Sequence, residues 1–273
     1  GGTYERGHKT GEWLHSPIET PSELEERLDK VEEMNLREFM FPENWEQEKQ
    51  RIYEKYGKKP DLKRGIRGPV TLATSIYGVE NLIYLYYDNI NLYRRFSQTI
   101  GEVVLEMAQI MDEEAGFEPE EAPAGFGFAD DNCCLLTPEM YKEFGYPILK
   151  KLFSYYSPGP EDKRYQHSDS DMAHLLPVLA ELNLTGCNFG PPVLVDEIRK
   201  YMPDTRIDGC LAPFTFMSNN QEEIIEEVKR DCKMIKNAGT KGLNLSTAGS
   251  INNGSSLESM RTVMYAIQEY GRY

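Results

Sequence analysis

Side chains capable of chemistry recur directly after short apolar runs in the second half of this chain. They are Asp130-Asp131, His167-Ser168-Asp169-Ser170-Asp171, Cys187-Asn188, Asp208-Gly209-Cys210 and Ser246-Thr247-Ala248-Gly249-Ser250. His167 and Asp169 are two residues apart, so an extended segment points both side chains to the same side. Imidazole and carboxylate groups both bind divalent metals, and this pair is therefore predicted to be half of a metal site.

Asp130 and Asp131 are adjacent carboxylates. Such pairs push each other's pKa values apart, which suits substrate binding or proton delivery. A structural interpretation stands beside this one, because short acidic residues at these positions also cap the helix that follows. It applies to Asp130, Asp169 and Asp171.

Further candidates follow the other predicted strands, and one more, Glu143, lies in the helix predicted to begin at 137. We expect Asn188 and Ser250 to bind substrate, Glu143 to contribute to catalysis and Cys210 to the metal site. Cysteine is also a small residue that is often buried, and this reading applies to Cys187 and Cys210.

Other catalytic classes lack their motifs. The chain has no GxSxG nucleophile elbow and no phosphate-binding P-loop. It has four histidines. His174 falls inside a predicted helix, so a site with several histidines would require His8 or His15 to fold back.

Strands and helices alternate from residue 125 onward. Predicted strands cover 125–129, 164–167, 184–189, 205–211 and 242–245, and predicted helices begin at 137, 172, 193, 220 and 257. This alternation predicts a parallel sheet of about six strands, or seven if 39–41 is one. An open doubly wound sheet and a closed eight-stranded barrel both fit. The absence of GxGxxG and the polar residues after the strands favour a (β/α)8 TIM-type barrel. If the barrel needs eight strands, this chain is expected to lack the first one, in agreement with a start at Gly1-Gly2-Thr3-Tyr4 without a Met.

The N-terminal third is polar and predicted to be helical. A helix over 22–34 opens with Ser22 as its cap and Glu25 as its capping-box partner, and a second covers 42–55. Residues 65–75 read as a short β-rich run, and 79–114 as a long helix with buried aromatic residues. We expect a helical arm or lid over residues 1–60 and the barrel over 61–273.

Charge and cysteine content exclude several classes of protein. Of 273 residues, 30 are Lys or Arg and 45 are Asp or Glu, which gives a net charge of −15. Such a surface repels nucleic acid and anionic lipid, and no apolar run is long enough for a transmembrane helix. The five cysteines show no CxxC spacing. Buried thiols in a reducing compartment, the cytoplasm, are therefore expected, with a homo-oligomer left open.

Several segments together resemble the uroporphyrinogen decarboxylase superfamily. They are Asp130-Asp131, residues 136–144 with the following Tyr146-Pro147, Gly68-Pro69-Val70-Thr71-Leu72-Ala73, and the closing Glu269-Tyr270-Gly271-Arg272-Tyr273. The order and spacing of these segments, from about residue 60 onward, carry the resemblance. It implies an eight-stranded α/β barrel with one of two chemistries: decarboxylation without a cofactor, or methyl transfer with zinc to a cobalamin-bearing partner.

The resemblance favours the methyltransferase branch, because the arginine-rich substrate grip of the decarboxylases is not recognised here. That branch has His-x-Cys and a distant Cys as zinc ligands, and the matching positions here are His167, Asp169 and Ser250. Serine is a poor ligand, so the third ligand is expected to be Asp131, Glu143 or Cys210.

The sequence thus predicts a metal-assisted methyltransferase that moves a methyl group between a small methylated compound and a corrinoid protein. One alternative is a metal-free lyase acting on a carboxylic acid, with Arg64, Arg67 or Arg164 as its cationic anchor. The other is a non-catalytic barrel that binds a ligand.

Overall fold

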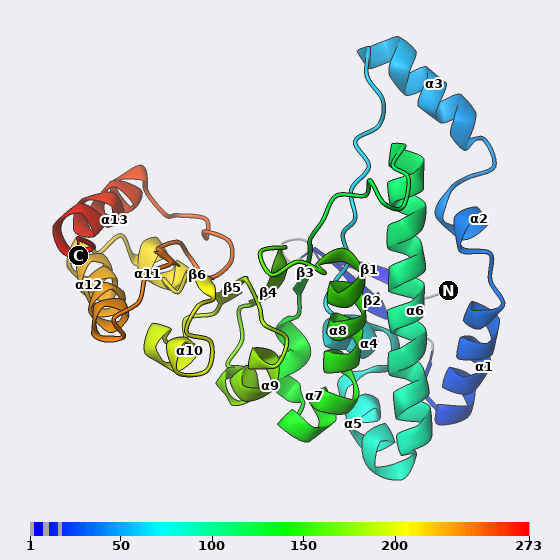
Figure 1. Ribbon diagram of the computed structural model, residues 1–273, viewed down its shortest axis with the longest axis horizontal. Helices are drawn as coiled ribbons and strands as arrows, with labels where there is room; N and C mark the ends of the chain where they lie inside the picture. Colours follow the sequence, from blue (N-terminus) through cyan, green and yellow to red (C-terminus); the bar gives the residue numbers. More distant parts are fainter. Residues whose placement is uncertain (1–2, 8–10, 16–17, 273) are drawn as a thin grey trace.

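A parallel sheet with helices packed on it forms the centre of the molecule (Figure 1). The structure is a computed structural model that describes residues 3–7, 11–15 and 18–272, the first two segments by their backbone only. Among the described helices, none has the length and apolar character needed to cross a bilayer.

The strand order of the sheet is sequential, and all neighbouring strands are parallel. The strands are β3 Phe126–Ala129, β4 Arg164–Ser168, β5 Gly186–Phe189, β6 Arg206–Asp208 and β7 Leu243–Asn244. A doubly wound sheet reverses its order at a switch point, and this sheet does not. The expected α/β alternation is confirmed. Within the described residues, β3 and β7 are the two edge strands of a five-stranded sheet.

Helices follow the strands, as predicted from the sequence pattern. Their bounds are α1 Pro21–Glu32, α2 Leu36–Met40, α3 Trp45–Tyr56, α4 Pro69–Tyr77, α5 Val79–Asp88, α6 Ile90–Ala115, α7 Pro138–Glu143, α8 Gly145–Tyr156, α9 Leu176–Ala180, α10 Val195–Tyr201, α11 Pro213–Ser218, α12 Gln221–Asn237 and α13 Leu257–Tyr270. Thr137 caps α7, as expected, and its side chain accepts a hydrogen bond from the Met140 amide. The long helix predicted over 79–114 is divided at Asn89, whose side chain caps α6.

The two faces of the sheet differ in chemistry because side chains alternate along a strand. Phe126 and Phe128 pack on Tyr156 and Phe153 of α8, with ring centroids 5.5 and 5.9 Å apart. The opposite face carries a row of polar residues in register across the four strands β4 to β7. This polar row consists of His167, Asn188, Asp208 and Asn244, with Ala129 beside His167.

The N-terminal part differs from the expectation of helices alone. Residues Thr3–Gly7 (β1) and Gly11–His15 (β2) form an antiparallel hairpin. Helix α1 begins at Pro21, and its cap is Thr20 with Glu23 in a capping box, rather than Ser22 with Glu25. The prediction of a strand over 39–41 is wrong, because 36–40 form helix α2.

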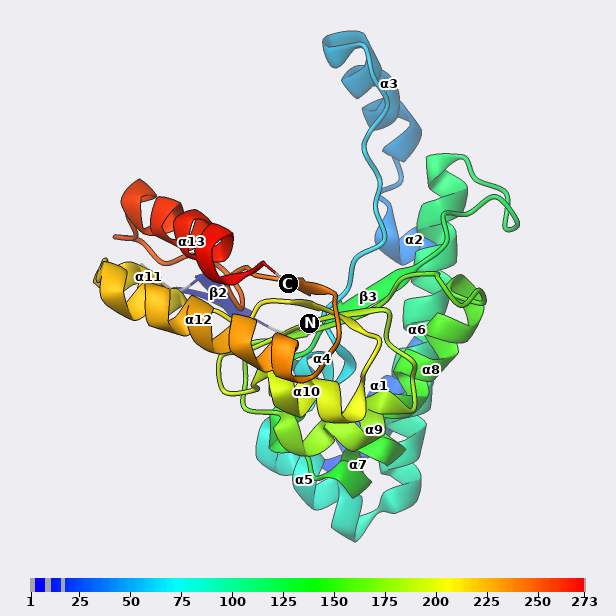
Figure 2. The ribbon, with the colours of Figure 1, turned by 60° about the vertical axis from the view of Figure 1, so that its left-hand side comes forward.

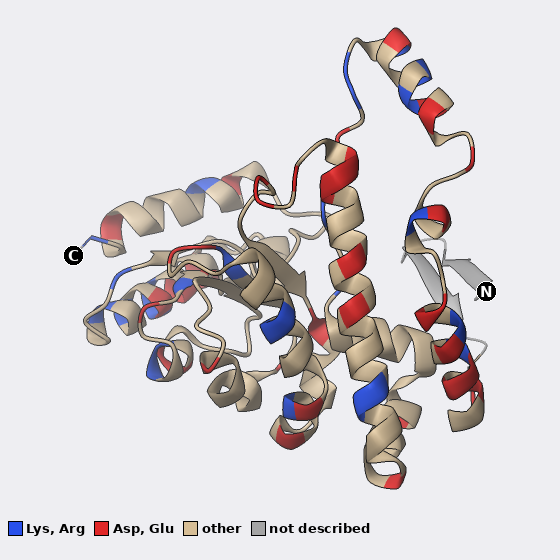
Figure 3. Cartoon of the chain, turned by 45° about the vertical axis from the view of Figure 1, so that its right-hand side comes forward, with Lys and Arg blue, Asp and Glu red and all other residues tan. Residues whose placement is uncertain are grey.

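Helix α3 extends away from the sheet (Figure 1, Figure 2) and buries none of its side chains. Basic and acidic residues are interleaved along it, as Figure 3 shows. Its Trp45 indole donates to Glu114 at the end of α6, 2.9 Å away. The helix is therefore attached mainly through polar contacts at its first turns.

Candidate metal centre

Three side chains that could hold a metal ion meet at the carboxyl ends of β3 and β4. They are Asp131, His167 and Asp169, and one ligand atom from each lies within 4.8 Å of the others. Asp131 follows β3, His167 is on β4 and Asp169 directly follows β4. The predicted pair is thus joined by Asp131, one of the three residues considered as the third ligand.

The tautomer of His167 is determined by its neighbour Asn188 on β5. The Asn188 side-chain nitrogen donates to the backbone carbonyls of Asp208 and Thr247, so its oxygen must face His167. That oxygen lies 2.7 Å from Nδ1 of His167, which must therefore carry a proton. In the neutral imidazole the lone pair is then on Nε2, the nitrogen that faces Asp169.

Asp169 lies between two loops, and each loop contacts it through a glycine residue. A Cβ on Gly190, after β5, would come within 2.4 Å of the Asp169 carbonyl oxygen, and one on Gly249, after β7, within 2.3 Å of its carboxylate. Gly249 also has a positive φ of 82°, which disfavours other residues. These close approaches bring the loops after β5 and β7 to the metal centre.

The Asp169 carboxylate is partly screened from water. Burial raises its pKa, the charge of His167 opposes this, and the charge of Asp131 adds to it. Its Oδ1 lies 3.4 Å from Nε2 of His167. The amide of Asp169 donates to Oδ1 of Asp131 at 2.8 Å, which holds the two acidic residues together.

Asp130 occupies a different environment from Asp131. Its side chain is fully buried, and its two oxygens accept hydrogen bonds from the amides of Val70 (3.2 Å) and Thr71 (2.7 Å) in the first turn of α4. Asp130 therefore caps a helix, but the one that precedes it in the chain rather than the one that follows. Burial raises its pKa to about 6, although the amide donors of α4 oppose the shift.

The contact between β3 and α4 requires a glycine. A Cβ on Gly68 would lie 2.1 Å from Cβ of Asp130, and the Gly68 amide donates to the Ala129 carbonyl at 2.7 Å. Pro69 then begins α4, where a missing N–H costs nothing. The predicted β-rich run over 65–75 is wrong except at Arg67, which forms a single parallel bridge to Ala129.

Other predicted site residues lie elsewhere. Glu143 forms an ion pair with Arg94 of α6 at 2.7 Å, and this partner lowers its pKa. Cys210 is fully buried, and burial raises the pKa of its thiol to about 12. Ser250 is exposed directly after Gly249. Neither Glu143 nor Cys210 belongs to the group of possible His, Cys, Asp and Glu ligands among the described residues.

Among the described residues, His174 and the five cysteines lie outside the candidate metal centre. His174 lies 2.9 Å from the Leu136 carbonyl through Nε2. His8 is outside the described residues, as is the side chain of His15. All five cysteines have free thiols, and the expected burial is confirmed for all but Cys134, which is half-buried.

A cavity of about 520 Å³ runs along the edge strand β3 and reaches His167. Its walls include Gly125, Gly127 and Ala129 of the β3 segment, whose small size leaves the space open. Tyr165, two residues before His167, also lines it. Sequence reasoning missed Tyr165, although the two-residue period of a strand places it on the same face.

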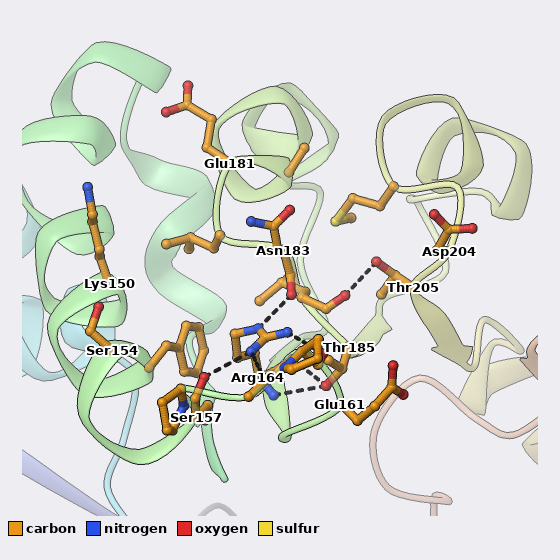
Figure 4. A pocket seen from close by; sticks show the side chains of 18 of the residues that line it. Lys150, Ser154, Ser157, Glu161, Arg164, Glu181, Asn183, Thr185, Asp204 and Thr205 are labelled. Atoms are coloured by element: carbon orange, nitrogen blue, oxygen red, sulfur yellow. Dashed lines mark hydrogen bonds between the residues drawn. The ribbon is translucent and has the colours of Figure 1, made fainter.

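A larger cavity of about 1130 Å³ lies at the opposite, amino ends of β4, β5 and β6 (Figure 4). Arg164 forms part of its wall, and its guanidinium donates to four backbone carbonyls, those of Asn183, Ser157, Gly159 and Pro160. Arg164 therefore holds these backbone segments together, and its donors are not available to bind a ligand. Polar ligands of a parallel barrel bind at the carboxyl ends of the strands, and the smaller cavity, which runs along β3, reaches that end at Ala129 and His167.

Comparison with known proteins identifies the family. The family model for uroporphyrinogen decarboxylase (URO-D) matches residues 3–270, nearly the whole chain. The chain belongs to the URO-D family. Among curated protein sequences, none matches it significantly.

A solved structure shares the URO-D-type fold of this chain. It is a methyltransferase from Methanosarcina mazei, with a TM-score of 0.67 and 18% sequence identity over 100% of this chain and 76% of that one. At this identity the likeness concerns the fold. The URO-D family and this neighbour agree with the α/β architecture expected from the sequence.

Proposed function

We propose that this protein is a methyltransferase that moves a methyl group between a small methylated compound and a corrinoid protein, with one bound zinc ion. The observation that carries the proposal is the group of Asp131, His167 and Asp169 at the carboxyl edge of the sheet. Membership of the URO-D family and the methyltransferase fold neighbour support it. The cavity beside His167 provides space for the substrate.

The donor set suits a divalent metal of the zinc type. One imidazole nitrogen and two carboxylates are accepted zinc ligands, and three protein ligands leave a position for substrate, as in catalytic zinc sites. The Asn188 contact supplies the outer hydrogen bond that metal-binding histidines normally have. A zinc ion held there would act as a Lewis acid that withdraws electron density from the methyl-bearing heteroatom.

The protein's own groups prepare this site before any ligand arrives. Asn188 keeps Nδ1 of His167 protonated and Nε2 available. Asp131 is exposed at the edge, while Asp169 is held by the loops after β5 and β7. Asp130 is assigned a positioning role: it caps α4 and so holds the segment that carries Asp131.

The metal-free lyase is the second candidate, because the same His167–Asp169 pair is an acid–base pair at 3.4 Å. Of its three expected anchors, Arg164 and Arg64 are engaged: Arg64 pairs with Asp112 at 3.1 Å. Arg67 remains, exposed and in register with Ala129.

Elemental analysis of the zinc-supplemented chain distinguishes the zinc-dependent methyltransferase from the metal-free lyase. We expect about one zinc per chain, absent in His167→Ala and retained in His174→Gln, a histidine outside the site. Methyl transfer to a corrinoid should then require the metal. A metal-free chain, or turnover of a carboxylic acid after the metal is stripped, would overturn the proposal in favour of the lyase.

A further inference from the structure

Helix α3 carries a stripe of apolar side chains, and most of this stripe is uncovered. It consists of Trp45, Ile52, Tyr53 and Tyr56, which the helical repeat brings to one side. The Trp45 end is attached to α6 through its hydrogen bond to Glu114. Further along, Tyr53 and Tyr56 are 54% and 58% exposed, and Figure 2 shows α3 clear of the other helices. An exposed apolar surface of this kind is typical of a binding interface.

A cluster of lysines stands beside this stripe at the tip of α3. Lys55, Lys58 and Lys59 are all exposed, and among the described residues no carboxylate lies within ion-pair distance of them. The Lys55 ammonium lies 5.0 Å from the ring centroid of Tyr56, so the positive charge and the apolar stripe are contiguous. In a chain with a net charge of −15, this tip is a local positive region that attracts an acidic surface. We call residues 45–61 the α3 arm.

The large cavity at the amino ends of β4, β5 and β6 is the second unpartnered surface, and we call it the amino-end groove. Three loops line it, at residues 157–161, 181–185 and 201–205. Its volume of about 1130 Å³ exceeds the roughly 300–1,000 Å³ of small-molecule sites. The donors of Arg164, its central polar group, are engaged by backbone carbonyls. The groove therefore suits a protein segment better than a small polar ligand.

Acidic side chains stand at the margin of the amino-end groove. They are Glu161, Glu181 and Asp204, and all three are exposed. Glu181 pairs with Lys142 at 2.8 Å, whereas within the described residues Glu161 and Asp204 have no cationic partner. Figure 4 shows Glu161 and Asp204 away from Lys150, which lies on the α8 side of the groove. This margin is complementary in charge to the tip of the α3 arm.

The α3 arm and the amino-end groove lie at the same edge of the sheet. The parallel bridge between Arg67 and Ala129 shows that the chain returning from the arm runs in the direction of β3. On its way it passes Phe126, the first residue of β3, whose ring centroid is 6.0 Å from the Arg64 guanidinium. The arm thus leaves the molecule at the amino end of β3. Because the strands are parallel, the loops of the groove are at that edge too.

We propose that two copies of this chain associate through their amino-end faces, with the α3 arm of each copy in the amino-end groove of the other. The apolar stripe lies in the groove, and the lysines at the tip meet Glu161 and Asp204. This arrangement is two-fold symmetric, so it makes each contact twice and closes on itself. Doubling the contact favours it, since specific interfaces bury about 1,200–2,000 Å² in total.

The carboxyl ends of the strands, with Asp131, His167 and Asp169, remain accessible in this dimer. The assignment is therefore independent of the proposed function. Helix α3, with 12 residues, is about 18 Å long, which allows it to extend beyond its own copy.

Charge reversal on each side of the contact tests the proposal by sedimentation equilibrium of the full chain. The arm variant carries Lys55→Glu with Lys58→Glu, and the groove variant carries Glu161→Lys with Asp204→Lys. Each variant alone places like charges together in both contacts, and we expect its dimer dissociation constant to rise at least about tenfold. An equimolar mixture of the two should dimerise within about threefold of the wild type, because one contact is native and the other has both charges reversed.

A matched control keeps the test specific. Lys233→Glu with Arg261→Glu reverses two exposed cations of α12 and α13, and it should leave dimerisation unchanged. Circular dichroism should show the same helix content in all variants, since every substituted residue is exposed. A monomeric wild type, a dimer that the arm variant leaves intact, or a mixture that stays dissociated would overturn the assignment. So would a monomeric chain whose arm binds a corrinoid protein instead.

The result is separable from that of the metal experiment. Zinc content should be equal in the wild type, the arm variant and the groove variant, because none of the substituted residues belongs to the candidate metal centre. A dimer without zinc leaves this inference standing and removes the proposed function. A zinc-binding monomer does the opposite.

Discussion

A single amide side chain decides what His167 can do. Asn188 has both of its donors engaged by carbonyl groups, so only its oxygen can meet the imidazole. The same residue would be read from sequence as a substrate ligand, but 7% of its surface is exposed and its groups are turned inward. Its function is therefore positioning.

Removing that amide should weaken metal binding. In Asn188→Ala, Nδ1 of His167 loses its acceptor and the imidazole is free to rotate. We expect zinc affinity to fall by about 10- to 100-fold in competition with a chromophoric chelator. Asn237→Ala, at the exposed end of α12, serves as the control. An unchanged affinity in Asn188→Ala would show that His167 is held by other contacts.

Asp130 should leave a signature in the pH dependence of stability. The pKa of Asp130 is raised from 3.8 to about 6 in the folded protein. Between pH 3.8 and about pH 6, this carboxyl group is therefore protonated in a larger fraction of native molecules than of unfolded ones. The contribution of this group to stability is therefore present below pH 4 and lost as pH rises through 6. Relative to Asp130→Asn, the unfolding free energy of the wild type should decrease by up to about 3 kcal/mol across this window.

Urea unfolding of both proteins at several pH values would measure this. A constant difference between wild type and Asp130→Asn from pH 4 to pH 7 would mean that the α4 amides keep the carboxylate ionised throughout.

At the scale of elements, the junction of β3 and α4 holds the candidate site together. The end of the strand and the start of the helix meet at Gly68, and Asp130, directly after β3, caps the helix. A β-rich reading of this segment was natural, because Val70 and Thr71 favour strands by propensity. Tertiary capping overrides that preference.

The junction predicts a sharp contrast between two glycines. In Gly68→Ala the new methyl group would overlap the side chain and the Cα of Asp130, so the backbone at this contact must move. We therefore expect a loss of at least about 2 kcal/mol in unfolding free energy. Gly65→Ala meets no atom within 4 Å and should change stability by less than about 0.5 kcal/mol. Thermal denaturation of both variants is the measurement, and similar melting temperatures would contradict the described contact.

At the scale of the whole molecule, the buried apolar residues that the structure describes form two cores. The main core joins the sheet to α1 and α4–α10 and includes Ile235 at the end of α12, while a second cluster lies between α11, α12 and α13. Its buried members are Leu211, Phe216, Ile224, Val228, Cys232, Val263 and Ala266. Figure 1 shows α11–α13 at the far end of the sheet from α6. The loop with Gly249 links this C-terminal part to the metal centre.

Because the two cores are separate, we expect each to unfold locally without the other. Val228→Ala should increase amide hydrogen exchange in α12 and α13 while leaving α6 unaffected, because the cavity weakens the second core alone. Val104→Ala, in the main core, should do the opposite. A uniform rise in exchange over the whole chain in Val228→Ala would show that the two cores unfold as one unit.

Local patterns in the sequence determined most of the elements after residue 125. Strand–helix alternation, the helix start at Thr137-Pro138 and the last helix from residue 257 each depend on neighbours in sequence, and the structure agrees with them. The pairing of His167 with Asp169 was also predictable, since two residues on extended backbone share a side.

Only the tertiary structure decided which partners surround that pair. Asp131 rather than Cys210 joins it, because the end of β3 lies beside the end of β4, while Cys210 turns into the core beside α12. The separation of Asp130 from Asp131, and the approach of Gly190 and Gly249 to Asp169, arise from contacts between distant segments. Sequence pattern is local, whereas burial, capping and electrostatic environment depend on what the fold brings close.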